Sequence, residues 1–288
     1  MADRSGSIPL AVLQKSVLQA FAAPHFIAIL VVLVAVADAA LKQPRDWKNP
    51  RVLWPMASAL AITGHLCFAN VGWLYRYEVY LVALSVVGFA ISAPRPKRWM
   101  LMIFVIPLAF RTWQCASVLP SAILHINSQQ VQMAHFVQQN FDTEAIAAHD
   151  IGALAFYSHA RILDLAGLAS HDVLDWRLSG NFDTDDIRRM SEDRKVKLAI
   201  VYDSWFQGEG SPRQFWIGPK LPATWVKAGE WRLRVPAVIG DLTVSFYATG
   251  RTALPDILSA LDKYSPRLPP GVQYLSPRSQ TMTSSGLH

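Results

Sequence analysis

A short run of aromatic and charged residues offers the clearest chemistry in the chain. Tyr75, Arg76, Tyr77 and Glu78 are consecutive, and Trp73 lies just before them. An arginine can bind a phosphate through two parallel hydrogen bonds, while neighbouring rings present a face to a sugar or a prenyl chain. The simpler interpretation is that the rings form an interfacial belt and that Arg76 pairs locally with Glu78. Both interpretations fit the spacing.

Two further polar residues lie within apolar runs. His65 lies near the end of one run, and Arg111 lies in another, three residues before Gln114. Charged and hydrogen-bonding groups at membrane depth are costly and usually face a bundle interior or a wet cavity. We therefore add His65 and Arg111 to the four consecutive residues as candidate binders of a donor phosphate. Arg111 has an alternative, because a long side chain near a span end can extend to the interface.

The sequence contains no signature of a nucleophile, a metal site, a phosphate loop or a dinucleotide-binding turn. Asp150, Asp164 and Asp203 each lie at the carboxyl end of an expected strand, where ligand sites form in α/β sheets, but carboxylates there more often cap the next turn. We therefore leave the catalytic residues unassigned and predict no metal or cofactor. Cys67 and Cys115 both lie in apolar runs, which excludes a disulfide framework.

Composition points to a membrane. The 288 residues are 52% hydrophobic and 17% charged, against about 25% charged in a typical soluble domain, and the formal net charge is +6. Residues 1–118 contain 11 Lys/Arg and 4 Asp/Glu, whereas residues 119–288 contain 16 and 17. The basic excess therefore lies between apolar runs, which counts against a nucleic-acid partner.

Four apolar runs approach the ~20 residues that a helix needs to cross a bilayer. They are residues 24–41, 52–71, 77–92 and 99–118. The two connections between the first and second runs and between the third and fourth are basic, so the positive-inside rule places both in the cytoplasm. Both chain ends are then extracytoplasmic. The expected fold is a membrane α-helical region of about four transmembrane helices, followed by an extracytoplasmic α/β domain.

The expected organisation has five parts. Residues 1–23 form an extracytoplasmic segment with an interfacial helix, 24–118 the four-span region, 119–141 an amphipathic linker helix, 142–275 the α/β domain and 276–288 a disordered tail. In the α/β domain, alternating apolar runs and helical segments predict neighbouring strands at 145–149, 162–165 and 197–202. From residue 224 onward the pattern indicates hairpins, with a closing helix over about 252–264.

Two stretches resemble polytopic bacterial glycosyltransferases of the GT-C fold class, which use polyprenyl-phosphate sugars. The first is HLCFANVGWLYRYEVY at residues 65–80, and the second is HDIGALAFYSHARILDLAGL at 149–168; QQVQMAHF at 129–136 is similar too. The resemblance implies that Arg76 contacts the donor phosphate and that Tyr75, Tyr77 and Glu78 shape its pocket. It also implies that Asp150 and Asp164 have structural roles in the extracytoplasmic domain and do not act as catalysts.

The chain also departs from that family. GT-C enzymes carry a catalytic acid in a long first extracytoplasmic loop and have many more spans, and neither feature is present. The leading hypothesis is therefore a C-terminal or incomplete portion that acts on a lipid-linked sugar at the outer face of the bacterial inner membrane as a multi-pass protein. Its partners would be the bilayer, a polyprenyl-phosphate sugar and an upstream membrane half or partner protein. The alternative is a non-enzymatic, membrane-anchored module that binds a glycan or an envelope protein; a transporter fragment ranks third.

Overall fold

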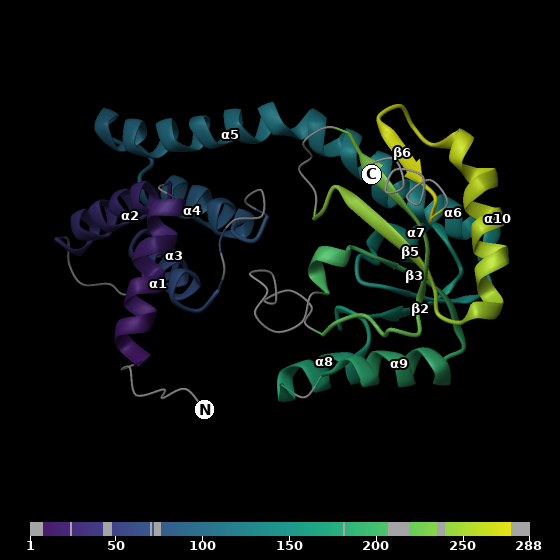
Figure 1. Cartoon of the computed structure of the whole chain (residues 1–288). Coiled ribbons are helices and arrows are strands. Elements are labelled where there is room, and N and C mark those ends of the chain that lie inside the picture. Colours follow the sequence, from purple (N-terminus) through teal and green to yellow (C-terminus); the bar gives the residue numbers. More distant parts are fainter. Residues whose placement is uncertain are drawn as a thin grey trace, which may run out of the picture. The chain divides into compact units, whose positions relative to one another are not determined.

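The protein divides into two compact units, Met1–Ser117 and Val118–His288, which we call the helical unit and the sheet unit (Figure 1). The structure is a computed structural model. It describes residues 8–23, 25–42, 48–69, 71, 76–180, 182–206, 219–234 and 240–277. Tyr75 and most of the expected tail at 276–288 lie outside the described residues.

The helical unit is built from consecutive helices. They are α1 (Ile8–Ala22), α2 (His25–Leu41), α3 (Pro50–Phe68), α4 (Val79–Ser92) and α5 (Arg98–Ile126). α3 packs against α1, α2 and α4, and the buried core includes Phe26, Leu33 and Ile62. At its start the Asn49 side chain accepts a hydrogen bond of 3.0 Å from the backbone N–H of Arg51, which fixes where α3 begins.

The prediction of about four transmembrane helices is wrong. Within the described residues, a single helix, Arg98–Asn140, is both long and apolar enough to cross a membrane, and there is a second only if the bent pair formed by α1 and α2 counts as one span. The apolar runs do become helices, but α2 has 17 residues and α4 has 14, which is short of the ~20 that a span needs. In α3, polar residues such as Ser58 and His65 dilute the apolar run.

The expected fourth span and the expected linker belong to one helix. α5 continues through a π-helical turn, Asn127–Val131, into α6 (Gln132–Asn140), so that 43 residues run without a break. The π turn carries Gln129 and Gln130, both buried. The expected boundary at 118/119 is therefore not marked by a change of backbone structure.

The sheet unit contains a mixed sheet whose described strands follow the order β2-β1-β3-β5-β4-β6. The strands are β1 (Ala145–Ala148), β2 (Arg161–Asp164), β3 (Val196–Val201), β4 (Val226–Leu233), β5 (Thr243–Ala248) and β6 (Val272–Leu275). β1 pairs in parallel with both β2 and β3, whereas β5, β4 and β6 add antiparallel pairs. The prediction that the first three strands are neighbours is confirmed.

Helices cover both faces of this sheet (Figure 1). They are α6, α7 (Gly152–Tyr157) and α10 (Leu254–Tyr264) on one face, and α8 (His171–Ser179) and α9 (Thr184–Asp193) on the other. Short 3₁₀ turns lie at Asp203–Trp205, Arg251–Ala253 and Ser265–Arg267. α9 begins with a capping box in which the Asp183 side chain accepts from the backbone N–H of Asp186 at 2.9 Å. The unit is therefore a three-layer α/β/α structure.

The hairpin region differs from expectation at Gly229. The sequence predicts two strands around residues 224–234, but they form the single strand β4, with a register irregularity between Lys227 and Gly229. The glycine does not make a turn there. A Cβ at Gly229 would lie 2.7 Å from the Tyr274 ring, so its missing side chain lets β6 approach β4 closely. β6 itself is unexpected, because its residues lie in a segment rich in proline.

Candidate functional site

Five polar side chains lie at one end of the helical unit, and we call them the polar cluster. They are His25, His65, Glu78, Tyr80 and Arg111. His25 starts α2, His65 is near the end of α3, and Glu78 and Tyr80 flank the start of α4. Arg111 lies 14 residues into α5, level with that end because α4 and α5 are successive helices joined by a short connection.

Arg111 and His25 form the most deeply placed pair of this cluster. The Arg111 guanidinium donates to Nε2 of His25 at 2.7 Å, and His25 is only 3% exposed. Because a guanidinium has donors and no acceptor, Nε2 of His25 must be unprotonated and its ring neutral. The pair therefore carries a single fixed positive charge, supplied by Arg111.

His65 and Tyr80 form the second pair. Nδ1 of His65 lies 2.8 Å from the Tyr80 hydroxyl, and the two rings meet edge to face. Phe26 links the pairs, since its ring centroid is 4.4 Å from that of His25 and 6.3 Å from that of His65. The two histidines thus share one environment, although they are 40 positions apart in the sequence.

The residues singled out from the sequence separate into two groups. His65, Glu78 and Arg111 belong to the polar cluster, and the Glu78 side chain is fully buried. Arg76 is exposed and lies 5.4 Å above the ring of Tyr77, which is itself 41% exposed. The local pairing of Arg76 with Glu78 is therefore not seen among the described ion pairs, and a cation–π contact takes its place.

Sequence reasoning missed His25 and Tyr80. His25 begins a run of apolar residues, so the criterion that selected His65, a polar group at membrane depth, also applied to it. Tyr80 was not selected because tyrosines are common near the ends of membrane spans and therefore carry little information there. The cluster as a whole offers a fixed cation, a phenol, two imidazoles and one buried carboxylate, and its hydrogen-bond donors suit a ligand that accepts hydrogen bonds. Among the described residues, no group of His, Cys, Asp and Glu has the geometry of a metal site.

The sheet unit offers a second candidate, at the carboxyl ends of its parallel strands. The Tyr202 hydroxyl lies 2.9 Å from Oε1 of Gln129, 3.0 Å from Nε2 of Gln130 and 3.2 Å from a carboxylate oxygen of Asp150. Burial, and then the nearby Asp150 carboxylate, raise the pKa of Tyr202 well above its ordinary value. The π turn of the long helix supplies both glutamines, which lock this strand end against the helix.

Asp203 is held in a similar way. Its carboxylate accepts hydrogen bonds from Lys227, Ser245 and Tyr247, each at 2.9 Å. Burial raises the pKa of Tyr247, and the Asp203 charge raises it further. Lys227 also contacts Glu230 at 2.6 Å; burial lowers the pKa of Lys227, but these carboxylates more than compensate and raise it. Every group here already has an internal partner.

Asp164 caps the turn after β2. It is 1% exposed and accepts hydrogen bonds from the backbone N–H groups of Ala166 at 2.8 Å and Ala169 at 2.6 Å. Arg177 donates to the carbonyl oxygen of Ala166. The strand-end carboxylates of the sheet unit therefore stabilise its own turns and helices, so the polar cluster of the helical unit is the stronger candidate site.

Comparison with known proteins gives one match. A family model described as a domain of unknown function, DUF8728, matches residues 122–247. This range runs from the end of α5 to β5 and covers less than half of the chain. No curated protein and no solved structure matches. Part of the sheet unit is thus similar to a family of unknown function, and the helical unit lies outside the match.

Proposed function

We propose that the chain is a membrane-associated, glycosyltransferase-related protein that binds a polyprenyl-phosphate sugar through the polar cluster. The observation that carries this proposal is the buried contact of Arg111 with His25, joined by Phe26 to the pair of His65 and Tyr80. A phosphate on this end of the unit would meet one fixed positive charge and several hydrogen-bond donors. The resemblance of residues 65–80 and 149–168 to GT-C enzymes supplies the class of ligand.

The surface of the helical unit supports association with a membrane. Large apolar side chains are exposed along one helix after another, and on α5 they include Val105, Ile106, Phe110 and Trp113. Soluble proteins rarely expose contiguous apolar patches of this kind, because burial in an apolar medium is favourable. The proposal requires one spanning helix, Arg98–Asn140, and does not require four.

The proposal is one of ligand binding, with no catalytic base assigned. Glu78 is the one carboxylate of the polar cluster, and it lies fully buried behind the start of α4. A carboxylate that is shielded from solvent is poorly placed to remove a proton from an acceptor. We therefore expect no sugar transfer by the chain on its own.

Binding of a short-chain polyprenyl phosphate to the full chain in neutral detergent tests this function. Arg111→Gln should weaken binding by ~1.5–3 kcal/mol, the contribution of a hydrogen bond to a charged group, and Arg111→Lys should restore only part of it. Arg98→Gln is the matched control, because Arg98 is an exposed arginine of the same helix. Equal binding by Arg111→Gln and Arg98→Gln, with both variants folded, would remove the assignment.

A second function has one observation in its favour. The sheet unit exposes large apolar side chains, with Phe156 80%, Leu168 82% and Leu178 77% exposed. Such residues favour a module that binds a glycan or an envelope protein without catalysis. In that case Phe156→Ser should abolish binding to fragments of cell-envelope glycan, whereas Arg111→Gln should leave it unchanged.

A further inference from the structure

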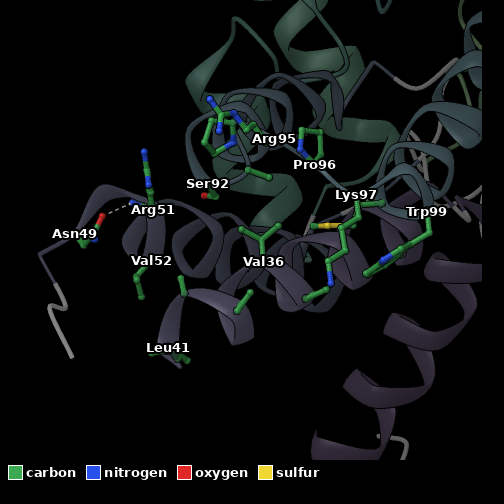
Figure 2. A pocket seen from close by; sticks show the side chains of 16 residues that line it. Val36, Leu41, Asn49, Arg51, Val52, Ser92, Arg95, Pro96, Lys97 and Trp99 are labelled. Carbon is green, nitrogen blue, oxygen red and sulfur yellow. Dashed lines mark hydrogen bonds between the residues drawn. The ribbon is translucent and has the colours of Figure 1, made fainter. Parts of the chain in front are cut away.

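A pocket of about 560 Å³ lies at the other end of the helical unit from the polar cluster (Figure 2). It is formed where α2 and α4 end and where α3 and α5 begin, and it includes the connection between α4 and α5. Its volume falls within the roughly 300–1,000 Å³ typical of ligand sites. The pocket takes no part in the function proposed above.

The wall and the rim of this pocket differ in chemistry. Val36 and the alanines of α2 contribute apolar surface, and Trp99 adds an aromatic side chain. The polar part is basic, with Arg51, Arg95 and Lys97, all exposed. Among the described lining residues there is no carboxylate. Figure 2 shows Val36 near the middle of the pocket and the three basic residues distributed around it.

The hydroxyl of Ser92 is an independent observation that points to a ligand in this pocket. Its hydroxyl oxygen is buried, lines the pocket and has no hydrogen-bond partner among the described residues. A buried hydroxyl without a partner is costly, and such groups are normally satisfied. An oxygen atom of a ligand that entered the pocket would accept a hydrogen bond from it.

We infer that this pocket binds one anionic phospholipid. Charge complementarity fixes the class of ligand, because three cations with no lining acid favour a phosphate, while the apolar wall favours a hydrocarbon chain. Basic pockets between membrane-associated helices are suited to anionic headgroups for the same reason. The phosphate would lie at Arg51, Arg95 and Lys97, with an ester or headgroup oxygen at Ser92 and the upper part of a chain against Val36.

Lipid binding to the full chain in a neutral detergent tests the inference. We would measure retention of dioctanoyl phosphatidylglycerol, its phosphatidylcholine analogue and soluble glycerol phosphate by native mass spectrometry. The wild type should retain the phosphatidylglycerol preferentially. The double variant Arg51→Gln/Arg95→Gln should weaken its binding about 30-fold, whereas the control Lys42→Gln/Arg98→Gln, which removes two nearby charges outside the pocket, should have little effect.

Two further variants keep the test decisive if the charge variants fold poorly. Ala39→Trp should fill the pocket and block the phospholipid. Ser92→Ala should weaken lipid binding several-fold without lowering the melting temperature of the lipid-free protein, since it removes a hydroxyl that has no partner. Equal loss in the pocket and control variants, or glycerol phosphate binding as tightly as the phospholipid, would overturn the inference. Neither result bears on the polar cluster, whose ligand is tested through Arg111.

Discussion

Among the described residues, the sheet unit buries most of its large aromatic side chains, whereas the helical unit exposes most of its own. In the sheet unit, Phe136 and Trp231 are at most 1% exposed, and their rings meet edge to face with centroids 5.6 Å apart. In the helical unit, Phe21, Phe68 and Trp113 are 75%, 82% and 64% exposed. The two units thus satisfy the hydrophobic effect differently. The sheet unit packs most of its rings between layers, with Phe156 an exposed exception, whereas the helical unit leaves most of its rings at its surface, with Phe26 buried.

This difference explains why hydropathy alone overestimated the number of spans. An apolar run shows that a segment avoids water, but not whether it does so in lipid or against other helices. α2 and α4 each bury one face in the core of the helical unit, through residues such as Leu33 and Phe89, and both are short for a span. The length of the folded helix and the burial of its faces, which the sequence does not show directly, decide whether a segment crosses lipid or packs against other helices.

The strongest test of a protein-filled core in the sheet unit is Ile200→Asp. Ile200 lies in β3, in register with Ala148 on one side and Phe246 on the other, and is 2% exposed. An unpaired carboxylate there costs several kcal/mol, which approaches the whole stability of a domain. We expect loss of the cooperative melting transition and rapid proteolysis of residues 142–275.

The control is Ile200→Val, which removes one methylene group and should cost only about 0.5–1.5 kcal/mol. A folded, protease-resistant Ile200→Asp protein would show that the layers around β3 are not closed to water.

The second test concerns the buried imidazole of His149. Its ring centroid lies 4.4 Å from that of Tyr202 and 5.0 Å from that of Trp205, and the residue is 4% exposed. Burial lowers the pKa of His149 from 6.5 to about 3. Below pH 6.5 the His149 imidazole is protonated in the unfolded chain but stays neutral in the folded chain. The stability present above pH 6.5 is therefore lost as the pH falls toward 3.

The expected loss is several kcal/mol at the acid end of that window. Denaturant unfolding at pH 7, 6 and 5 measures its onset, with His149→Leu as the comparison, because this variant lacks the titrating group. The wild type should lose stability faster than His149→Leu over this range. Parallel pH profiles of the two proteins would mean that water or another partner reaches the ring.

The sheet unit was largely predictable, and the reason is local. Its parallel strands are short apolar runs between helical segments, so local patterns were enough to place them. The parts that sequence reasoning missed depend on distant contacts. The residue type of Gly229 suggests a turn, but the structure places Tyr274 of β6 against it. β6 itself lies in a segment rich in proline, where no strand was expected.

The candidate site was predictable in part. The criterion of a polar residue in an apolar run found His65 and Arg111, and it applied equally to His25. It did not show that Arg111 would contact His25, since these residues are 86 positions apart and meet only when α2 and α5 pack. The motif around Arg76 drew attention to the right end of the unit, but its arginine is exposed and the cation of the cluster comes from another helix.

A third test compares two glycines inside helices of the helical unit. A Cβ at Gly88 of α4 would lie 2.9 Å from the Ser58 hydroxyl of α3, whereas a Cβ at Gly64 would meet nothing within 4 Å. Alanine has the better helix propensity, so Gly64→Ala should stabilise the protein by roughly 0.5–1 kcal/mol. Gly88→Ala should lose that gain, and Gly88→Val should cost about 1–3 kcal/mol through overpacking. Thermal unfolding in detergent measures all three; a stabilised Gly88→Val would show that α3 and α4 are not in close contact.

The smallest expected effect on stability, and the sharpest contrast with Arg111, belongs to Arg76. Its guanidinium is exposed and stacks over Tyr77, a contact of less than about 1 kcal/mol, so Arg76→Gln should leave the melting temperature nearly unchanged. If its guanidinium also meets the phosphate at the surface of the polar cluster, the same variant should weaken binding of the polyprenyl phosphate, by less than Arg111→Gln does.

The dependence of binding on salt concentration distinguishes the role of Arg76 from that of Arg111. Exposed charges are screened at high ionic strength and buried ones much less, so raising the salt concentration should remove the effect of Arg76→Gln on binding while preserving that of Arg111→Gln. Arg76→Lys should behave like the wild type at low salt if only its charge matters, and like Arg76→Gln if the planar fork is needed. Binding by Arg76→Gln that equals the wild type at every salt concentration would restrict the site to the buried cluster and leave the aromatic run as an interfacial belt.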